Sequence, residues 1–337
     1  MENRFFNDNA IKSIQSPEGK IKFLLQFATL APSTHNSQPW LFKVNDNSCE
    51  IYLDRSKQLP EADKKGRDMY ISLGCCIENL LIAARSYGTS PSLELVLKND
   101  FIAVVKFDNL NKKIEIKQKK LLEAIKKRVN LRGFYKKEAI PSELINKLKS
   151  YSVNYPLVEF HPIVDEQKRI KIVDLTAKGL RLAYQNRHFR NEMSLWFNSN
   201  DSSRKEGIPG YSINLPLIIS KIFPIVIKHF NVGKIVSLLN KKSMRTSSLI
   251  SVFTTKNNTK KEWIEVGMMA ERLMLELRTT DIYSAVYVAS IEMGQLSEEL
   301  KQILETKDHV QFLFCSGYAD KPNQYVPRFT VEEKLID

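Results

Sequence analysis

Cysteine is scarce in this sequence of 337 residues, which has four, Cys49, Cys75, Cys76 and Cys315, and no Cys-x-x-Cys pair. So few cysteines exclude a disulfide framework and favour a reducing compartment. The first twenty residues mix acidic, amide and basic side chains without an apolar core, so a secretory leader is not expected. The sequence therefore predicts a cytoplasmic protein.

Long apolar runs are also missing. The longest candidate, Leu215–Lys228, is interrupted by Lys221 and Pro224 and is shorter than the roughly 20 residues that a membrane-spanning helix needs. With 43% hydrophobic and 26% charged residues, the composition is that of a folded globular protein rather than a collagen, a coiled coil or a disordered chain. We therefore expect no membrane partner.

Several sequence motifs of catalysis and ligand binding are absent. There is no G-x-x-x-x-G-K-[ST] and no G-x-G-x-x-G, so neither a P-loop nor a standard dinucleotide-binding turn is predicted. The five histidines are scattered without metal-ligand spacing, and we expect no metal site. No G-x-S-x-G elbow is present, although a Ser or Cys nucleophile in another setting stays open. The sequence therefore leaves the catalytic residue unassigned.

Negative charge is in deficit. The 51 Lys and Arg residues exceed the 38 Asp and Glu residues, for a formal net charge of +13. This balance favours an anionic partner such as nucleic acid, a phosphorylated cofactor or an anionic membrane surface. Because no basic motif interleaved with aromatic residues is present, no specific nucleic-acid partner is expected.

What the sequence does contain is the hydrophobic spacing of a mixed α+β fold. This spacing predicts helices over 21–30, 68–87, 117–132, from 141 onward, 166–198, 263–279 and 297–304, and strands over 40–44, 49–53, 92–97, 101–107, 158–163, 249–254 and 310–317, with a short segment at 285–291. The order helix, hairpin, helix, strands occurs in 18–110 and again in 120–330. The second copy is interrupted at about 199–262, which we interpret as an insertion or lid.

The most informative segment is Ala31–Trp40. Its polar run from Ser33 to Gln38 stands between an apolar helix and an apolar strand, so its side chains are expected at the edge of the core with hydrogen-bond partners. One reading is that Ser and Thr after Pro32 satisfy only the helix end and the loop backbone. The other is that they contact a ligand.

A basic segment follows later in the chain. Residues 117–132 hold seven Lys or Arg residues, and the simplest interpretation of a basic amphipathic helix is a solvated face. Trp40 is expected in the core rather than at a cofactor, because a Trp that opens a strand is more often buried. His35 is assigned no role in proton transfer.

Two motifs together resemble the nitroreductase-like FMN flavoproteins. Ala31-Pro-Ser-Thr-His-Asn-Ser-Gln-Pro-Trp40 resembles the family loop A-P-S-x-x-N-x-Q-P-W. Lys127-Arg-Val-Asn-Leu-Arg-Gly-Phe134 is similar to the family motif R-x-S-x-[RK]-x-F, with Asn130 where the family usually has Ser. The two motifs occur in the reverse of the usual order, as in the tandem Acg-like branch, which 67–80, 208–211 and 317–334 also resemble.

The resemblance implies a nitroreductase-like fold made of two tandem units, residues 1–115 and residues 116–337, which form an intramolecular pseudo-dimer. It implies FMN as the cofactor, with Arg128 and Arg328 at the phosphate, Arg132 near the N1/O2 edge of the flavin, and the polar loop at the ribityl chain, the phosphate and the ring edge. The segment around residue 290 is expected to offer a backbone N–H to flavin N5. The implied FMN-binding residues are Ser33, Thr34, Asn36, Gln38, Arg128, Asn130, Arg132, Ser290, Glu292 and Arg328.

The function implied by the resemblance is an FMN-dependent oxidoreductase that passes hydride through flavin N5 from NAD(P)H to a nitro, quinone or similar small-molecule acceptor. The alternative is an FMN-sequestering or storage protein of the Acg type, in which the lid blocks NAD(P)H turnover. A homodimer of pseudo-dimers stays open as the assembly.

Overall fold

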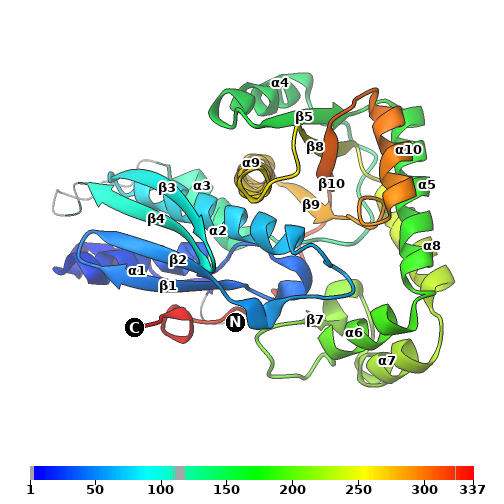
Figure 1. The fold of residues 1–337 in the computed structure, drawn as a ribbon, viewed down its shortest axis with the longest axis horizontal. Helices are drawn as coiled ribbons and strands as arrows, with labels where there is room; N and C mark the ends of the chain where they lie inside the picture. The colour runs from blue at the N-terminus through cyan, green and yellow to red at the C-terminus, as the bar shows by residue number, and fades with distance from the viewer. Residues whose placement is uncertain (1–3, 109, 111–117, 323) are drawn as a thin grey trace.

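Two four-stranded antiparallel sheets lie on either side of a pair of long helices, α2 and α9 (Figure 1). The structure is a computed structural model that describes residues 4–108, 110, 118–322 and 324–337. Helices and sheets are mixed along the chain, as the hydrophobic spacing predicts. None of the described helices combines the length and the apolarity that crossing a membrane requires.

The first sheet is built from the N-terminal third of the chain, with strand order β1-β2-β4-β3. Its elements are α1 (Pro17–Ala28), β1 (Trp40–Asn45), β2 (Ser48–Leu53), α2 (Arg67–Ser86), β3 (Ser90–Lys98) and β4 (Phe101–Asp108). The side chain of Ser16 accepts a hydrogen bond from Gly19 N and Pro17 occupies the first turn, which fixes the start of α1. The expected helix, hairpin, helix and two strands are all confirmed.

The second sheet has the strand order β5-β8-β10-β9. Its elements and the helices around it are α3 (Lys119–Lys127), α4 (Ser142–Ser150), β5 (Val158–Ile163), β8 (Leu249–Thr255), α9 (Lys260–Arg278), β9 (Ile282–Val286), α10 (Gly294–Leu304) and β10 (His309–Tyr318). In each sheet, the long helix connects the second strand to the third. The two sheets therefore have the same order, first, second, fourth, third.

A helical insertion separates β5 from β8. It consists of α5 (Glu166–Ala183), α6 (Arg187–Trp196), the two-residue strands β6 (Phe197–Asn198) and β7 (Ile208–Pro209), α7 (Leu217–His229) and α8 (Gly233–Arg245). The expected lid range, 199–262, covers the second half of this insertion. Residues 249–262 of that range form β8 and the beginning of α9 instead.

Two expected helices differ from the structure. The helix expected over 166–198 is two helices, because Asn186 starts α6 as an N-cap whose side chain accepts from His188 N. The helix expected over 117–132 ends at Lys127, and its first residue lies outside the described residues. The chain after Lys127 is extended, and Leu131 N donates to Ser284 O of β9, so pairing with a strand replaces the helical hydrogen bonds there.

The crossing of α2 and α9 is unusually close. A Cβ atom added to Gly74 would lie 2.0 Å from the carbonyl oxygen of Ile264, and one added to Gly267 would lie 2.0 Å from the carbonyl oxygen of Ile71. Each helix thus presents an Ile-x-x-Gly sequence to the other, and the contacts are reciprocal. Only glycine allows the two backbones to approach this far.

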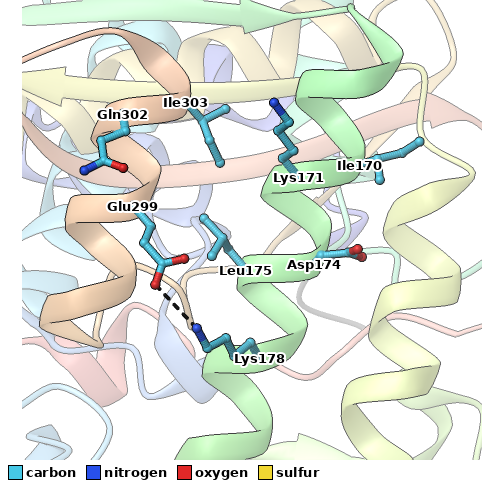
Figure 2. Close-up of a pocket in the computed structure, with 8 residues that line it drawn as sticks. All are labelled: Ile170, Lys171, Asp174, Leu175, Lys178, Glu299, Gln302 and Ile303. Atoms are coloured by element: carbon cyan, nitrogen blue, oxygen red, sulfur yellow. Dashed lines mark hydrogen bonds and ion pairs between the residues drawn. The ribbon is translucent and has the colours of Figure 1, made fainter.

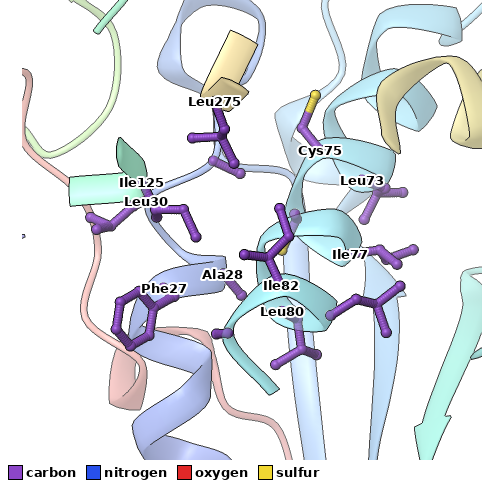
Figure 3. Packing of buried hydrophobic residues seen from close by; sticks show 14 of the residues in the cluster. Phe27, Ala28, Leu30, Leu73, Cys75, Ile77, Leu80, Ile82, Ile125 and Leu275 are labelled. Carbon is purple, nitrogen blue, oxygen red and sulfur yellow. The ribbon is translucent and has the colours of Figure 1, made fainter. Parts of the chain in front are cut away.

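The hydrophobic core continues through this crossing. Figure 3 shows side chains of α1, α2, α3 and α9 packed together, among them Phe27, Leu80, Ile125 and Leu275. The same cluster includes Phe253 of β8 and Phe314 of β10, so both sheets share one core. Apolar burial therefore joins the two halves of the chain at this crossing.

The end of the chain returns to the first sheet. Leu335 forms a parallel bridge with Phe42 of β1, and Ile336 N donates to Phe42 O at 2.9 Å. In Figure 1 this segment, coloured red, runs beside β1. Residues far apart in the sequence are thereby brought to the loop that precedes β1.

Candidate functional site

The polar loop between α1 and β1 has a strained backbone. His35, Asn36 and Gln38 have φ values of 52°, 56° and 52°, in the left-handed region that side chains other than glycine disfavour. Ser33 Oγ accepts from Gln38 N at 2.9 Å and closes the loop. Strained backbone of this kind persists only when the surrounding contacts hold it, and it concentrates at functional sites.

The amide side chains of the loop join three distant segments. Gln38 Nε2 donates to Lys205 O at 2.8 Å, and Gln38 Oε1 accepts from Phe329 N at 2.9 Å. Asn36 Nδ2 donates to Lys205 O at 3.0 Å and to Pro327 O at 3.2 Å. These two predicted site residues therefore bond to the insertion and to the C-terminal segment, while the hydroxyl of Thr34 donates to Asp68 at 3.4 Å.

Three arginines gather beside the loop. Arg4 Nη1 donates to the carbonyls of Lys126 and Arg128, both at 2.9 Å, and Arg128 Nη2 donates to Leu30 O at 2.9 Å. Arg328 Nη1 donates to Asn36 Oδ1 at 2.5 Å. Arg128 and Arg328 are thus brought together as the resemblance implies, and Arg4 joins them.

The charge of this arginine cluster, Arg4, Arg128 and Arg328, is poorly compensated. Burial, and then the neighbouring Arg128, lower the pKa of Arg4 to about 9. Burial also lowers the pKa of Arg328 well below its ordinary value, and Arg4 and Arg128 lower it further. Glu271 lies 3.2 Å from Arg128 Nε, but one carboxylate cannot balance three guanidinium groups.

Unpartnered donors mark the same place. The Nε atom of Arg328 is buried and has no hydrogen-bond partner within the described part of the chain, and Arg128 Nε forms no hydrogen bond there although a carboxylate oxygen of Glu271 lies 3.2 Å away. A buried donor without a partner costs about 1–3 kcal/mol, so a ligand that accepts these hydrogen bonds would be stabilised. A phosphate group has the charge and the acceptor oxygens for this arrangement.

A second group of residues continues the site away from the arginine cluster. Arg132 Nη2 donates to Val286 O at 3.1 Å, and its guanidinium lies 5.2 Å from the ring centroid of Tyr287. Arg132 Nε and His35 Nδ1 are buried without partners among the described residues. Burial, and then Arg132, lower the pKa of His35 to about 3, so this imidazole is neutral.

Asn130 has a structural role beside Arg132. Its Oδ1 accepts from Val286 N at 2.7 Å, and its backbone pairs with Ser284 in a parallel bridge. This pairing extends the edge of β9 and sets the direction in which the Arg132 side chain leaves the backbone. Asn130 thus keeps a hydrogen-bonding side chain at this position of the motif, and the group it binds is β9.

The last two predicted site residues, Ser290 and Glu292, contact different elements. Ser290 is buried with its hydroxyl 3.1 Å from that of Thr176 on α5. Glu292 pairs with Arg67, which also lies 3.3 Å from Asp68. Ser290 therefore helps to hold its segment against α5, while Glu292 faces the start of α2.

Glu292 belongs to a crowded acidic group with Asp63 and Asp68. Burial raises the pKa of Glu292 to about 8, with Asp68 and Asp63 adding to the effect and Arg67 opposing it. Burial, and then Asp68, raise the pKa of Asp63 to about 7. Three carboxylates around one guanidinium therefore retain a proton near neutral pH.

A separate groove lies between α5 and α10 (Figure 2). It has a volume of about 570 Å³, and Lys178 and Glu299 form an ion pair across it at 3.4 Å. None of the predicted site residues lines this groove. The candidate site is therefore the arginine cluster with the polar loop and Arg132.

Sequence reasoning missed Arg4. It stands in a short N-terminal stretch that matches no motif, and only the folded chain brings it to the arginine cluster. The signal available in the sequence was its basic charge beside Phe5 and Phe6, which is too common to identify a site.

Comparison with known proteins gives a local match. No family model matches the chain. It is 34% identical over 74 residues to a Mycobacterium tuberculosis protein named "Putative NAD(P)H nitroreductase acg". It is also 34% identical over 68 residues to a second protein of that organism, which is likewise named as an NAD(P)H nitroreductase. These matches cover 22% and 20% of this chain and equal shares of the relatives, so the chain spans about a fifth of the length of the curated relatives it matches.

Two solved nitroreductase structures are similar to part of the chain. An FMN and NADPH-dependent nitroreductase NfnB from sphigopyxis sp. strain HMH has a TM-score of 0.44 at 15% identity, over 64% of this chain and 97% of its own. The FMN-dependent nitroreductase NfnB from Mycobacterium smegmatis has a TM-score of 0.42 at 16% identity, over 64% and 96%. Over about a fifth of its length, the chain is thus similar in sequence to proteins named as NAD(P)H nitroreductases, one of them of the Acg type.

Proposed function

We propose that the chain binds FMN and acts as an NAD(P)H-dependent oxidoreductase on a small-molecule acceptor such as a nitro compound or a quinone. The observation that carries this proposal is the arginine cluster, whose buried charge exceeds that of Glu271 and in which Arg328 Nε has no hydrogen-bond partner among the described residues. These donors fit a phosphate monoester. The name of the Mycobacterium tuberculosis relative, an NAD(P)H nitroreductase, supports the same activity.

Different residues would bind different parts of FMN. Arg4, Arg128 and Arg328 would hold the phosphate, and Arg132 would place a fixed positive charge at the flavin ring, where it stabilises negative charge. When bound, FMN supplies the hydride-accepting atom of the reaction. The neutral state of His35 leaves Arg132 as the nearby positive charge, since burial keeps the imidazole unprotonated.

We also propose that the chain is a tandem repeat whose two units form a pseudo-dimer. The equal strand orders of the two sheets and the reciprocal Ile-x-x-Gly contacts of α2 and α9 support this relation. Residues 1–115 would contribute the polar loop and Arg4, while 116–337 would contribute Arg128, Arg132 and Arg328. One chain would then supply the groups that two subunits supply in an ordinary family member.

A specific observation favours a second candidate, FMN sequestration. Hydrogen bonds connect the insertion to the site. Ser243 Oγ donates to Gly133 O at 2.6 Å, and Asn214 Nδ2 donates to Arg132 O at 3.4 Å. Lys205 of the same insertion accepts from both amide side chains of the polar loop. A fastened insertion of this kind would act as a lid that excludes a nicotinamide ring.

The visible spectrum of the purified protein, followed by anaerobic addition of NADPH and then NADH, separates the two functions. Flavin absorbance that either nucleotide bleaches supports the oxidoreductase. Flavin absorbance that only dithionite bleaches supports sequestration. A colourless protein that cannot be reconstituted with FMN refutes both, and light scattering on the same sample measures whether two chains associate.

A further inference from the structure

The outer faces of α7 and α8 carry many exposed apolar side chains. On α7, Ile218, Ile222 and Ile225 are 78%, 50% and 62% exposed, and their spacing of four and three residues places them on one face of the helix. On α8, the exposed apolar residues are Ile235, Leu238 and Leu239, and Phe230 is exposed in the connection between the helices. Exposed apolar surface on this scale marks an interaction site.

This apolar surface lies in a segment without negative charge. From residue 207 to residue 261 the sequence contains no Asp or Glu, while 207–248 contains six Lys or Arg residues. Lys221 pairs with Asp201, and Lys241 and Arg245 share Asp174. The other three basic residues, Lys228, Lys234 and Lys242, are exposed, and no ion pair is formed by them within the described part of the chain.

We propose that the α7–α8 face, the exposed apolar residues of α7, α8 and their connection together with Lys228, Lys234 and Lys242, docks on an anionic lipid bilayer surface. Apolar side chains would enter the boundary between headgroups and acyl chains, and the flanking lysines would contact the lipid phosphates. This proposal concerns peripheral contact and departs from the expectation of no membrane partner.

The geometry excludes a spanning role for the same helix. α7 has 13 residues, which at about 1.5 Å per residue gives a length of roughly 20 Å, against a hydrocarbon thickness of roughly 30 Å. Helices α6, α7 and α8 lie together at the end of the molecule opposite α1 (Figure 1). The helices that carry the α7–α8 face thus lie at one end of the protein.

Charge decides between a bilayer and a second copy of the chain. In a symmetric dimer the same patch meets itself, so Lys228, Lys234 and Lys242 would face identical cations with no carboxylate from 207–261 to separate them. An anionic bilayer supplies the missing negative charge along the whole face. The observations therefore favour lipid as the occupant.

The test is flotation of the full chain with vesicles of phosphatidylcholine alone and with vesicles of equal parts phosphatidylcholine and phosphatidylglycerol. We expect binding to the anionic vesicles that falls as salt is added, and little binding to the neutral ones. Equal binding to both vesicle types, or binding to neither, overturns the proposal.

Two variants and one control make the test specific. Each lysine that is removed should weaken binding to anionic vesicles roughly fivefold, so the variant K228Q/K234Q/K242Q should bind them roughly a hundredfold more weakly. The variant I218S/I225S should also lose binding, whereas the control K149Q/V153S, which removes one exposed lysine and one exposed valine near α4, should bind like the wild type. Circular dichroism verifies that each variant is folded.

Light scattering detects the competing occupant. A wild-type dimer that I218S/I225S converts to a monomer, together with no flotation, would assign the face to self-association and overturn the proposal. Flotation needs no flavin, so a failure to bind FMN would refute the proposed function without affecting this result.

Discussion

Replacing Arg328 with glutamine should weaken the binding of FMN while leaving the binding of riboflavin almost unchanged. Arg328 reaches the arginine cluster through its contact with Asn36, and its Nε atom has no partner among the described residues. A charge-assisted hydrogen bond contributes about 1.5–3 kcal/mol, so the Kd for FMN should rise roughly 10- to 150-fold. Riboflavin has the same ring and ribityl chain without the phosphate, and so reports any general damage to the site.

The stability of the flavin-free protein should change in the opposite direction. The pKa of Arg4 falls from 12.5 to about 9, which at about 1.4 kcal/mol for each pKa unit corresponds to an upper bound of about 5 kcal/mol for the cost of burying that charge. Part of this cost is repulsion by Arg128. Arg4 and Arg128 in turn lower the pKa of Arg328. R328Q removes this third buried charge, so the flavin-free variant should be at least as stable as the wild type.

Both results can be measured on one set of samples. Quenching of flavin fluorescence gives the Kd for FMN and for riboflavin, and thermal unfolding with and without FMN gives the stability. Arg187 on α6 is exposed, so R187Q is a matched control that should behave like the wild type. The reasoning is refuted if R328Q weakens riboflavin as much as FMN, or if FMN affinity stays within about threefold, which is less than 1 kcal/mol.

Three further predictions follow from other parts of the structure. G74A and G267A should each reduce the free energy of unfolding in urea by about 3 kcal/mol or more, because the new methyl group meets a backbone carbonyl. The control is G294A, since Gly294 has open space around it. Equal effects of all three substitutions would contradict the close crossing of α2 and α9. The pKa of Glu292 is raised to about 8, so the folded protein retains a proton that the unfolded chain releases, and stability should fall as pH rises from about 5 to about 8. In E292Q, the melting temperature should depend less on pH over that window. An unchanged pH dependence would disprove the assignment. If the insertion restrains turnover, S243A should increase the rate of flavin reduction by NADPH in stopped flow, since it removes the hydrogen bond to Gly133; a slower or equal rate would show that this contact does not gate the site.

The elements of the first sheet could be predicted because their patterns are local. The alternation in β1 and β2 and the dense apolar spacing of α2 need no information from elsewhere in the chain. The same method extended the basic helix past Lys127, because nothing local shows that Leu131 will pair with Ser284. It also joined α5 to α6, since Asn186 is a weak signal within a long helical pattern.

Sequence motifs name some residues of the candidate site by their type. Arg128 and Arg328 meet at one place, but the polar atoms of Asn36 and Gln38 bond to segments that no local pattern connects with them. Left-handed backbone in the loop depends on those same distant contacts. Arg4 shows the limit most clearly, because its role comes entirely from tertiary proximity.

The contact between Arg328 and Asn36 joins residues 292 positions apart in the sequence. During synthesis, the polar loop, α1 and β1 therefore leave the ribosome long before the residues that complete their surroundings. The nascent first sheet must persist with an open edge at β1, and without the contacts that hold the loop, until the C-terminal segment with Leu335 and Ile336 arrives. We therefore expect the proposed FMN site to form only after translation of the C-terminal segment, and any binding of FMN to be a late event that follows folding of the whole chain.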